Sequence, residues 1–353
     1  MSSPTLADVA REVGVSRTTV SNAYNRPDQL SPALRARILA AAERLGYPGP
    51  DPVARGLRRG RTGMFGLVAD QPLSFLFTDA AIREFLIGMT TVWDEAEVSL
   101  VLLPRLLVDD AGSAVLANAA VDGFVSICDA HNAARVAALT TRHLPFVVVD
   151  GVASPADCRV GIDDRGASRE AVEHLLSLGH RRIGVASLPR VPGDGGGRVD
   201  PASPGLLRYP VTAARLAGIR DGLEAAGVAW ADVPVVAVPD DLTPRLSARA
   251  VGESLLDLAD PPTAVVCLSD EVAAGVLDAA GDRGLAVPGA LSVVGFDDTA
   301  TASSTTPPLT TVHQPMQAKG EAAARLLLDG APPADVLLPT ELIVRGSTGP
   351  VPA

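Results

Sequence analysis

The chain has 353 residues, of which 47% are apolar and 20% charged, a composition typical of globular domains with sizeable cores. No apolar run approaches the roughly 18 to 20 residues that a membrane-spanning helix needs, and the N-terminal segment lacks the apolar region of a signal peptide. We therefore expect a cytoplasmic protein with no membrane partner. The cysteines Cys128, Cys158 and Cys267 are odd in number and widely spaced, which argues against a disulfide framework or a metal site, and no cofactor is expected.

Charge is unevenly distributed along the chain. The formal net charge is −11, yet residues 1–62 hold ten Arg and five acidic residues, a net of +5, and the remainder carries a net of −16. A basic minor segment on an acidic body favours phosphate contacts made by that segment alone, since each neutralised phosphate adds a salt-dependent increment to affinity. Arg outnumbers Lys twenty-nine to one, which indicates codon bias toward GC-rich DNA.

The first predicted elements are two short helices. Thr5 and Asp8 are typical of an N-cap with a back-reaching acid, and Gly14 should end the first helix. Ser16 can cap a second helix that begins only a few residues later. Two short helices joined by a glycine turn make a helix-turn-helix; the alternative is an ordinary helical miniature domain with no DNA role. The residues left on the outward face of the second helix are Arg17, Thr18, Ser21 and Asn22.

A third helix should complete a small domain over residues 1–49. Ser31 is its expected N-cap, Pro32 begins it, and Gly46 ends it. Its apolar positions can close a core with the first two helices. The segment therefore predicts an independent three-helix headpiece.

Residues 50–62 predict a hinge. Asp51 is a good N-cap and Pro52 suits a first helical position, so a helix of about two turns could start here. A helix this short is marginal alone in water and should fold only against a partner. One reading is a flexible basic linker. The other is a hinge helix that orders on DNA, with Leu57 wedged between base pairs in the minor groove.

From residue 63 onward, apolar runs alternate with amphipathic segments, the βαβ pattern of parallel sheets. The expected strands are 64–69, 99–103, 123–127, 145–149, 183–187, 235–238, 264–268 and 291–296. The expected helices lie near 80–97, 111–119, 133–141, 165–178, 213–226, 244–258 and 271–283. We predict an α/β body of two doubly wound subdomains with a cleft between the carboxyl ends of their strands. The expected division is an N-subdomain of 63–162 and 293–318 and a C-subdomain of 163–292 and 319–353.

A Gly/Pro-rich segment, residues 189–210, interrupts this pattern. Its run Gly193–Gly197 could be read as a phosphate loop. No Gly-Lys-Ser/Thr follows it and prolines surround it, so a plain surface loop is the preferred interpretation.

Several motifs taken together resemble the lactose-repressor/galactose-repressor (LacI/GalR) family of bacterial transcription regulators. The match runs nearly end to end and is most specific in the headpiece and hinge. The motifs are Thr5–Ala10, Val15-Ser16 with Thr19–Ser21, Gly46-Tyr47, Val53–Arg55 with Leu57, Ser292–Asp298, Pro308–Val312 and Leu338–Thr348.

The resemblance implies that double-stranded DNA is a partner. By position, it assigns base reading in the major groove to Arg17, Thr18 and Asn22, and Arg and Asn suit guanine and adenine edges, respectively. It assigns phosphate contacts to Ser16, Thr19, Ser21 and Asn25. It assigns the minor-groove hinge to Val53, Ala54, Arg55 and Leu57. A pseudo-palindromic operator and a homodimer follow from the family's symmetry.

The resemblance also implies a periplasmic-binding-protein-like body with a small-molecule effector in its cleft, most simply a sugar. The implied effector residues are Arg215, Asp297, Ser269, Asp270, Asp150, Phe77 and Asp79. For Ser269 and Asp270, a helix N-cap is the competing reading. Where relatives place an aromatic platform the alignment puts Leu242, so a nucleobase or another non-sugar metabolite remains an alternative.

Three other protein classes fit the sequence less well. A periplasmic-type sugar-binding protein needs an export signal and has no use for a basic helix-turn-helix. A cytoplasmic ligand-binding protein without DNA function would leave the headpiece unexplained. An enzyme finds no support, because the sequence contains no nucleophile elbow and no metal-ligand spacing, and adjacent Asp pairs such as Asp297-Asp298 point to opposite faces of a strand.

Overall fold

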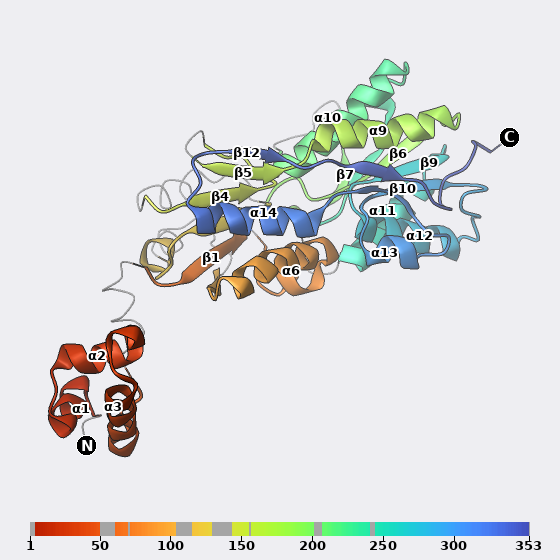
Figure 1. Ribbon diagram of the computed structural model, residues 1–353. Coiled ribbons are helices and arrows are strands. Elements are labelled where there is room, and N and C mark those ends of the chain that lie inside the picture. Colours follow the sequence, from red (N-terminus) through yellow and green to blue (C-terminus); the bar gives the residue numbers. More distant parts are fainter. Residues whose placement is uncertain are drawn as a thin grey trace. The chain divides into compact units, whose positions relative to one another are not determined.

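The computed structural model describes residues 4–49, 61–69, 71–103, 115–128, 143–154, 157–200, 207–240 and 244–352 (Figure 1). The chain divides into two units, Met1–Gly63 and Met64–Ala353. The predicted hinge residues Val53, Ala54, Arg55 and Leu57 lie outside the described residues, as do Leu242 and the helix expected near 133–141.

The first unit is a three-helix bundle of α1 (Leu6–Val13), α2 (Arg17–Asn25) and α3 (Pro32–Leu45), with a 3-10 turn, η1 (Pro27–Gln29), before α3. The helices bury a core of small and branched apolar side chains, because each presents one apolar face to the other two. The buried members of this core are Val9, Ala10, Val20, Ala23, Ile38, Ala41 and Ala42.

The predicted helix ends of the headpiece are confirmed. The Asp8 carboxylate accepts the backbone N–H of Thr5 at 2.9 Å and its hydroxyl at 2.7 Å. Ser16 Oγ accepts the N–H of Thr19 at 3.0 Å, and Ser31 Oγ accepts the N–H of Leu34 at 3.3 Å. Left-handed glycines end two of the helices, Gly14 with φ 74° and Gly46 with φ 69°. Local sequence therefore sets each of these boundaries.

The second unit contains two sheets. The first has the strand order β12-β5-β4-β3-β1-β2, with every pair parallel. Helices α6 (Ala80–Glu95) and α14 (Met316–Asp329) share the core on one face, and Figure 1 shows them beside each other, although they are far apart in the sequence. A short helix, α5 (Phe75–Thr78), precedes α6. The strands are β1 (Met64–Ala69), β2 (Ser99–Leu103), β3 (Phe124–Ile127), β4 (Phe146–Val149), β5 (Cys158–Gly161) and β12 (Asp335–Leu337).

The second sheet has the order β13-β11-β10-β9-β6-β8-β7, parallel except at its two antiparallel edge strands, β13 and β7. Helices α9 (Asp164–Ser177) and α10 (Pro210–Ala225) cover one face, and α11 (Pro244–Leu256) and α12 (Asp270–Asp282) cover the other. The strands are β6 (Ile183–Ser187), β7 (Gly197–Val199), β8 (Val235–Ala237), β9 (Ala264–Cys267), β10 (Ser292–Asp297), β11 (Thr310–His313) and β13 (Glu341–Ile343). Two short helical elements lie in the connections: η2 (Trp230–Asp232) between α10 and β8, and α13 (Ala300–Ser304) between β10 and β11.

The expected subdomain division is wrong in its C-terminal part. Strands β10 and β11, placed by the sequence in the N-subdomain, lie in the second sheet. Helix α14 and strand β12, placed in the C-subdomain, belong to the first sheet and its core. Among the described residues, three segments pass between subdomains: one after β5, one between β11 and α14, and one between β12 and β13.

The segment 189–210 is more than the plain loop that was expected. Its residues Gly197–Val199 form the edge strand β7. The buried Asp194 carboxylate accepts the N–H of Arg190 and pairs with its guanidinium at 2.9 Å, while Asp240 accepts the N–H of Gly193 at 2.7 Å. The glycine run is therefore a braced turn that leads into a strand.

Glycines allow the covering helices to pack closely in pairs. A Cβ on Gly88 of α6 would overlap the carbonyl oxygen of Gln317 in α14, and a Cβ on Gly218 of α10 would overlap that of Arg165 in α9. Both helix pairs therefore have backbone-to-backbone contact, which larger residues would prevent. Across the described ranges, no helix is long and apolar enough to cross a membrane.

Candidate DNA interface and ligand cavity

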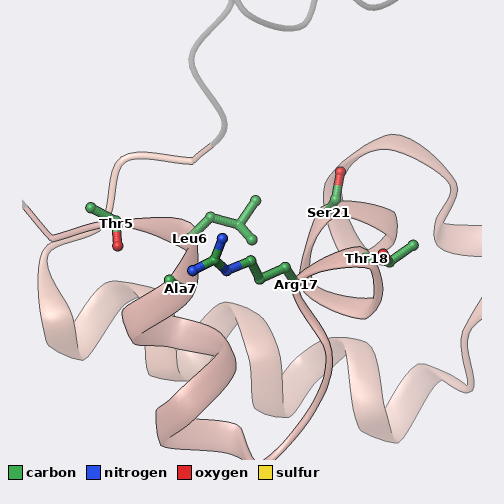
Figure 2. Close-up of a pocket in the computed structure, with 6 residues that line it drawn as sticks. All are labelled: Thr5, Leu6, Ala7, Arg17, Thr18 and Ser21. Carbon is green, nitrogen blue, oxygen red and sulfur yellow. The ribbon is translucent and has the colours of Figure 1, made fainter.

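The headpiece presents a polar surface at the start of α2. Arg17 and Thr18 are exposed, and with Ser21 and the beginning of α1 they line an open hollow of about 500 Å³. Figure 2 shows the Arg17 side chain reaching from α2 toward Leu6 and Ala7, with Thr18 and Ser21 beside it on α2. The predicted base-reading residues Arg17 and Thr18 thus share one accessible face with the predicted phosphate contact Ser21.

The side chains of the other DNA-contacting residues predicted in the headpiece form hydrogen bonds within the headpiece itself. Asn22 donates to Gln29 Oε1 at 3.3 Å, and Asn25 donates to the Ser21 carbonyl at 3.0 Å. Ser16 and Thr19 share a hydrogen bond of 2.8 Å between their hydroxyls. These bonds orient the side chains along the second helix. Those of Ser16 and Thr19 lie at its start, where backbone N–H groups and the helix dipole favour anions.

The body contains a cavity of about 160 Å³ with walls from both subdomains. Five of the expected effector residues line it: Asp79 and Asp150 from the first subdomain, and Arg215, Ser269 and Asp297 from the second. Asp79 also caps α6 by accepting the N–H of Ile82 at 2.8 Å, and Ser269 caps α12 by accepting the N–H of Val272 at 3.2 Å. Asp79 and Ser269 therefore each cap a helix and line the cavity.

Two expected effector residues, Asp270 and Phe77, do not line the cavity. Asp270 is fully buried, and its carboxylate accepts the N–H of Thr299 at 2.7 Å and the hydroxyl of Thr311 at 2.6 Å. It braces the start of α12 against β11 and the loop after β10. Phe77 is 58% exposed, and its neighbour Phe75 lines the cavity instead.

Arg215 is the central cation of the cavity wall. Its Nε donates to Asp164 at 2.8 Å, and its Nη1 donates to the Leu268 carbonyl at 2.6 Å and reaches Asp297 at 3.4 Å. Its guanidinium carbon lies 3.6 Å from the centre of the Phe296 ring. Two carboxylates therefore compensate its charge, and its orientation is held from several sides.

A second cation lies behind the wall and was not predicted from sequence. Lys319 in α14 is fully buried, and its ammonium donates to both oxygens of Asp150, at 2.7 and 2.8 Å, and to Gln314 Oε1 at 2.6 Å. Gln314 donates from its Nε2 to Asp297. A continuous polar chain thus joins Asp150 of the first subdomain to Asp297 of the second. The one available sequence signal was that Lys319 is the only lysine among 353 residues.

Three cavity residues adopt left-handed backbone conformations at the carboxyl ends of strands. Cys128 follows β3 with φ 50°, Asp150 follows β4 with φ 50°, and Asp297 ends β10 with φ 115°. Such conformations are uncommon for residues other than glycine, and they cluster at functional sites. Here they turn side chains of both sheets toward one space.

Burial changes the ionisation of the cavity groups. It raises the pKa of Asp79, and the nearby Glu271 raises it further. Burial likewise raises the pKa of Asp297, against the opposing effect of Arg215. Burial also raises the pKa of the Cys128 thiol, so this group is a neutral side chain at neutral pH. These shifts favour the neutral forms of the three groups, because the buried lining stabilises negative charge poorly.

Aromatic side chains line the cavity, although sequence analysis did not select them. Phe75 lies in α5, and Tyr209 precedes α10. The Tyr209 hydroxyl accepts a hydrogen bond of 3.3 Å from Gln71 Nε2, which links the second subdomain to the first. Short helices and turns carry these residues, where no apolar periodicity marks them.

Comparisons with known proteins agree with this architecture. Residues 5–49 match the family described as bacterial regulatory proteins, lacI family, and residues 172–348 match the periplasmic binding protein-like domain. An HTH-type transcriptional regulator of Mycolicibacterium smegmatis is 42% identical over 363 residues, which cover 99% of this chain and 97% of that protein.

Solved structures match over nearly the whole chain. The lac repressor dimer bound to operator and the anti-inducer ONPF has a TM-score of 0.79 and 26% identity, covering 99% of this chain and all (100%) of that one. A complex of the transcriptional regulator CelR with cellobiose has a TM-score of 0.69 and 29% identity, covering 98% of this chain and 99% of that one. The chain, with its helix-turn-helix headpiece and periplasmic-binding-protein-like body, belongs to the LacI family of DNA-binding transcriptional regulators.

Proposed function

We propose that this protein is a homodimeric, non-enzymatic repressor that binds a pseudo-palindromic operator and responds to a small hydroxylated effector, most simply a sugar. The observation that carries the proposal is a cavity whose wall joins polar residues of both subdomains, in a chain that also has a basic headpiece.

The headpiece supports the DNA part of the proposal. Arg17 and Thr18 are exposed together at the start of α2, where they can meet base edges in a major groove. The hydroxyls of Ser16, Thr19 and Ser21 surround the same helix start and suit phosphate contacts. The basic charge of residues 1–62 adds attraction to the DNA backbone.

The cavity supports the effector part. Carboxylates from Asp79, Asp150 and Asp297 offer acceptors, and the rings of Phe75 and Tyr209 offer apolar surface. A ligand that contacts both subdomains can favour one of their relative orientations, and it shifts operator affinity only by its differential binding, typically about 1 to 3 kcal/mol. In this mechanism, reorientation changes the spacing of the paired headpieces and the packing of the hinge segments in the minor groove.

The proposal is tested by selecting binding sites from random duplexes with the purified protein. A palindrome should emerge, and one member of a panel of mono- and disaccharides and purines should change the protein's affinity for it in an anisotropy titration.

Replacing Arg17 by Ala should relax the base preference at one position of each half-site, because a bidentate Arg–guanine pair contributes about 1 to 3 kcal/mol of discrimination. A uniform affinity loss across all sequences would assign Arg17 to phosphate, and the absence of any enriched palindrome would contradict the operator.

A nucleobase is the second candidate effector, favoured by the presence of two aromatic side chains, Phe75 and Tyr209, in the cavity wall. Planar bases stack on such rings. The purine members of the panel separate the two candidates directly.

A further inference from the structure

The single lysine of this chain lies next to the cavity, and codon bias does not explain why a lysine is kept at this position. Twenty-nine cationic positions are Arg and one is Lys. That one, Lys319, is fully buried in α14, directly behind the cavity residues Asp150 and Gln314. A compact ammonium with three diverging N–H groups meets three acceptors here, an arrangement that the planar fork of Arg does not reproduce.

The contacts of Lys319 fix the orientation of its neighbours. Its three N–H groups go to both Asp150 oxygens and to Gln314 Oε1, so the Gln314 amide must turn its Nε2 toward Asp297. The negative charge of Asp150 is thereby compensated by Lys319, and that of Asp297 is compensated by Arg215. Each of these wall carboxylates therefore has a cation held in place by the protein.

The cavity has little capacity for a further negative charge. Both cations are already paired with carboxylates, and Asp79, Asp240 and Glu271 add acidic groups to the lining. Burial raises the pKa of Asp79 and Asp297, because it disfavours their charged forms, and the neighbouring acids Glu271 and Asp270, respectively, raise it further. A phosphate or carboxylate entering this space would meet like charges at low dielectric.

We infer that Lys319 is a positioning residue that sets the ligand's charge: with Arg215, it compensates the wall carboxylates so that the cavity accepts an uncharged, hydroxyl-donating ligand and rejects phosphorylated or carboxylated ones. This inference rests on the proposed effector function and adds the charge class of the ligand. From behind the wall, the Lys319 ammonium supplies the positive charge that a ligand ammonium would otherwise supply to Asp150.

The first test compares matched ligands by calorimetry on the full-length protein. The probes are glucose, galactose and mannose, their 6-phosphates and their 2-amino analogues. At least one neutral sugar should bind, and its 6-phosphate should bind about 100-fold more weakly, since like-charge juxtaposition costs several kcal/mol. Equal or tighter binding of the 6-phosphate overturns the inference.

The second test uses Lys319→Met. With Asp150 uncompensated, the affinity ratio of the amino sugar to its neutral parent should rise by about tenfold. The double variant Asp150→Asn/Lys319→Met, which removes both charges, should restore the original ratio and keeps the test valid if the single variant does not fold. The matched control is Arg325→Met, which removes one exposed cation from the same helix and should leave the ratio unchanged. Equal weakening of all probes in Lys319→Met would show a merely structural role and overturn the inference.

A third measurement does not depend on the identity of the effector. Labelling with [ε-¹³C]lysine gives one lysine resonance, because the chain contains one lysine. Inorganic phosphate should leave this resonance unmoved, and a saturable shift would overturn the inference. Failure of all nine monosaccharide probes would instead contradict a monosaccharide effector, while the phosphate result still decides the charge class.

Discussion

At the scale of single residues, Asp270 shows how an expected ligand contact becomes a structural brace. Its carboxylate is buried and ties α12 to Thr299 and Thr311. Burial raises the pKa of Asp270 to about 7, although the hydrogen bonds from both threonines lower it. The group therefore titrates near neutral pH within the folded body.

Replacing Asp270 by Asn should remove a pH dependence of stability. A carboxyl whose pKa is higher in the folded than in the unfolded chain contributes stability below about pH 4, and this contribution is lost as the pH rises through about 7. The difference between the ordinary value of 3.8 and about 7 corresponds to about 4 kcal/mol as an upper limit. Urea unfolding from pH 4 to 8 should show wild type losing stability relative to Asp270→Asn.

Asp282→Asn is the control for this experiment, because Asp282 lies on the same helix with its side chain 47% exposed. Its stability difference from wild type should not follow the same profile. Parallel pH profiles for wild type and Asp270→Asn would contradict the assigned titration.

Residue roles were predictable where they depend on neighbours in sequence. Thr5, Ser16 and Ser31 cap helices as expected, because a cap needs only a side-chain oxygen and the next N–H groups. Phe77 and Asp270 do not line the cavity, although each lies within two positions of a residue that does, Phe75 or Ser269, because the direction of a side chain depends on tertiary packing. Gln314 and Lys319 were missed because the polar chain that joins them exists only in three dimensions.

At the scale of elements, the helix pairs depend on positions without a side chain. Gly88 of α6 faces the Gln317 carbonyl of α14, and Gly320 of α14 faces the Phe85 carbonyl of α6. The reciprocal contacts join a helix from the start of the body to one near its end. The close approach therefore holds together parts of the first subdomain that are remote in sequence.

Gly88→Ala should destabilise the body by at least about 2 kcal/mol, because the added methyl meets backbone that cannot rotate away and the helices must separate. Gly281→Ala in α12 is the matched control, since a Cβ there meets nothing within 4 Å. It should be neutral or stabilising by about 0.5 to 1 kcal/mol. Urea denaturation measures both, and an unchanged midpoint for Gly88→Ala would refute the packing argument.

Element prediction succeeded for strands with a buried apolar run, including the three-residue β8, and failed for strands without one. Strand β1 and its neighbours have continuous apolar runs that need no tertiary information. Strands β12 and β13 have only three residues each, with exposed positions, so no run marks them. Helix α14 was assigned to the wrong subdomain because its partner α6 lies more than two hundred positions away in the chain.

At the scale of the whole body, the hydrogen bond between Gln71 and Tyr209 links the two subdomains beside the cavity. The βαβ pattern predicted both sheets, yet the paths that connect them were not predictable, because three crossings can be arranged in several ways with the same local pattern. The link favours the arrangement of subdomains seen in the structure.

Tyr209→Phe should weaken binding of the effector by about two- to tenfold, since one hydrogen bond contributes about 0.5 to 1.5 kcal/mol. The selectivity among ligands should not change, because the ring remains in the wall. Calorimetry with whichever sugar binds wild type measures the change. Tyr24→Phe, in the headpiece, is the control and should bind that sugar as wild type does. Unaltered affinity in Tyr209→Phe would mean that the link does not bias the orientation of the subdomains.

The buried position of Lys319 has a consequence for the chemical modification of the protein. Acetyltransferases and the enzymes that conjugate small protein tags act on lysine side chains that they can reach. The only lysine of this chain is 0% exposed, so these enzymes reach no lysine in the folded body. A lysine-directed mark can be added only after the body opens, and it would then block refolding by removing the ammonium that Asp150 requires. Lysine modification would therefore report on the damaged protein and leave the native regulator unmarked.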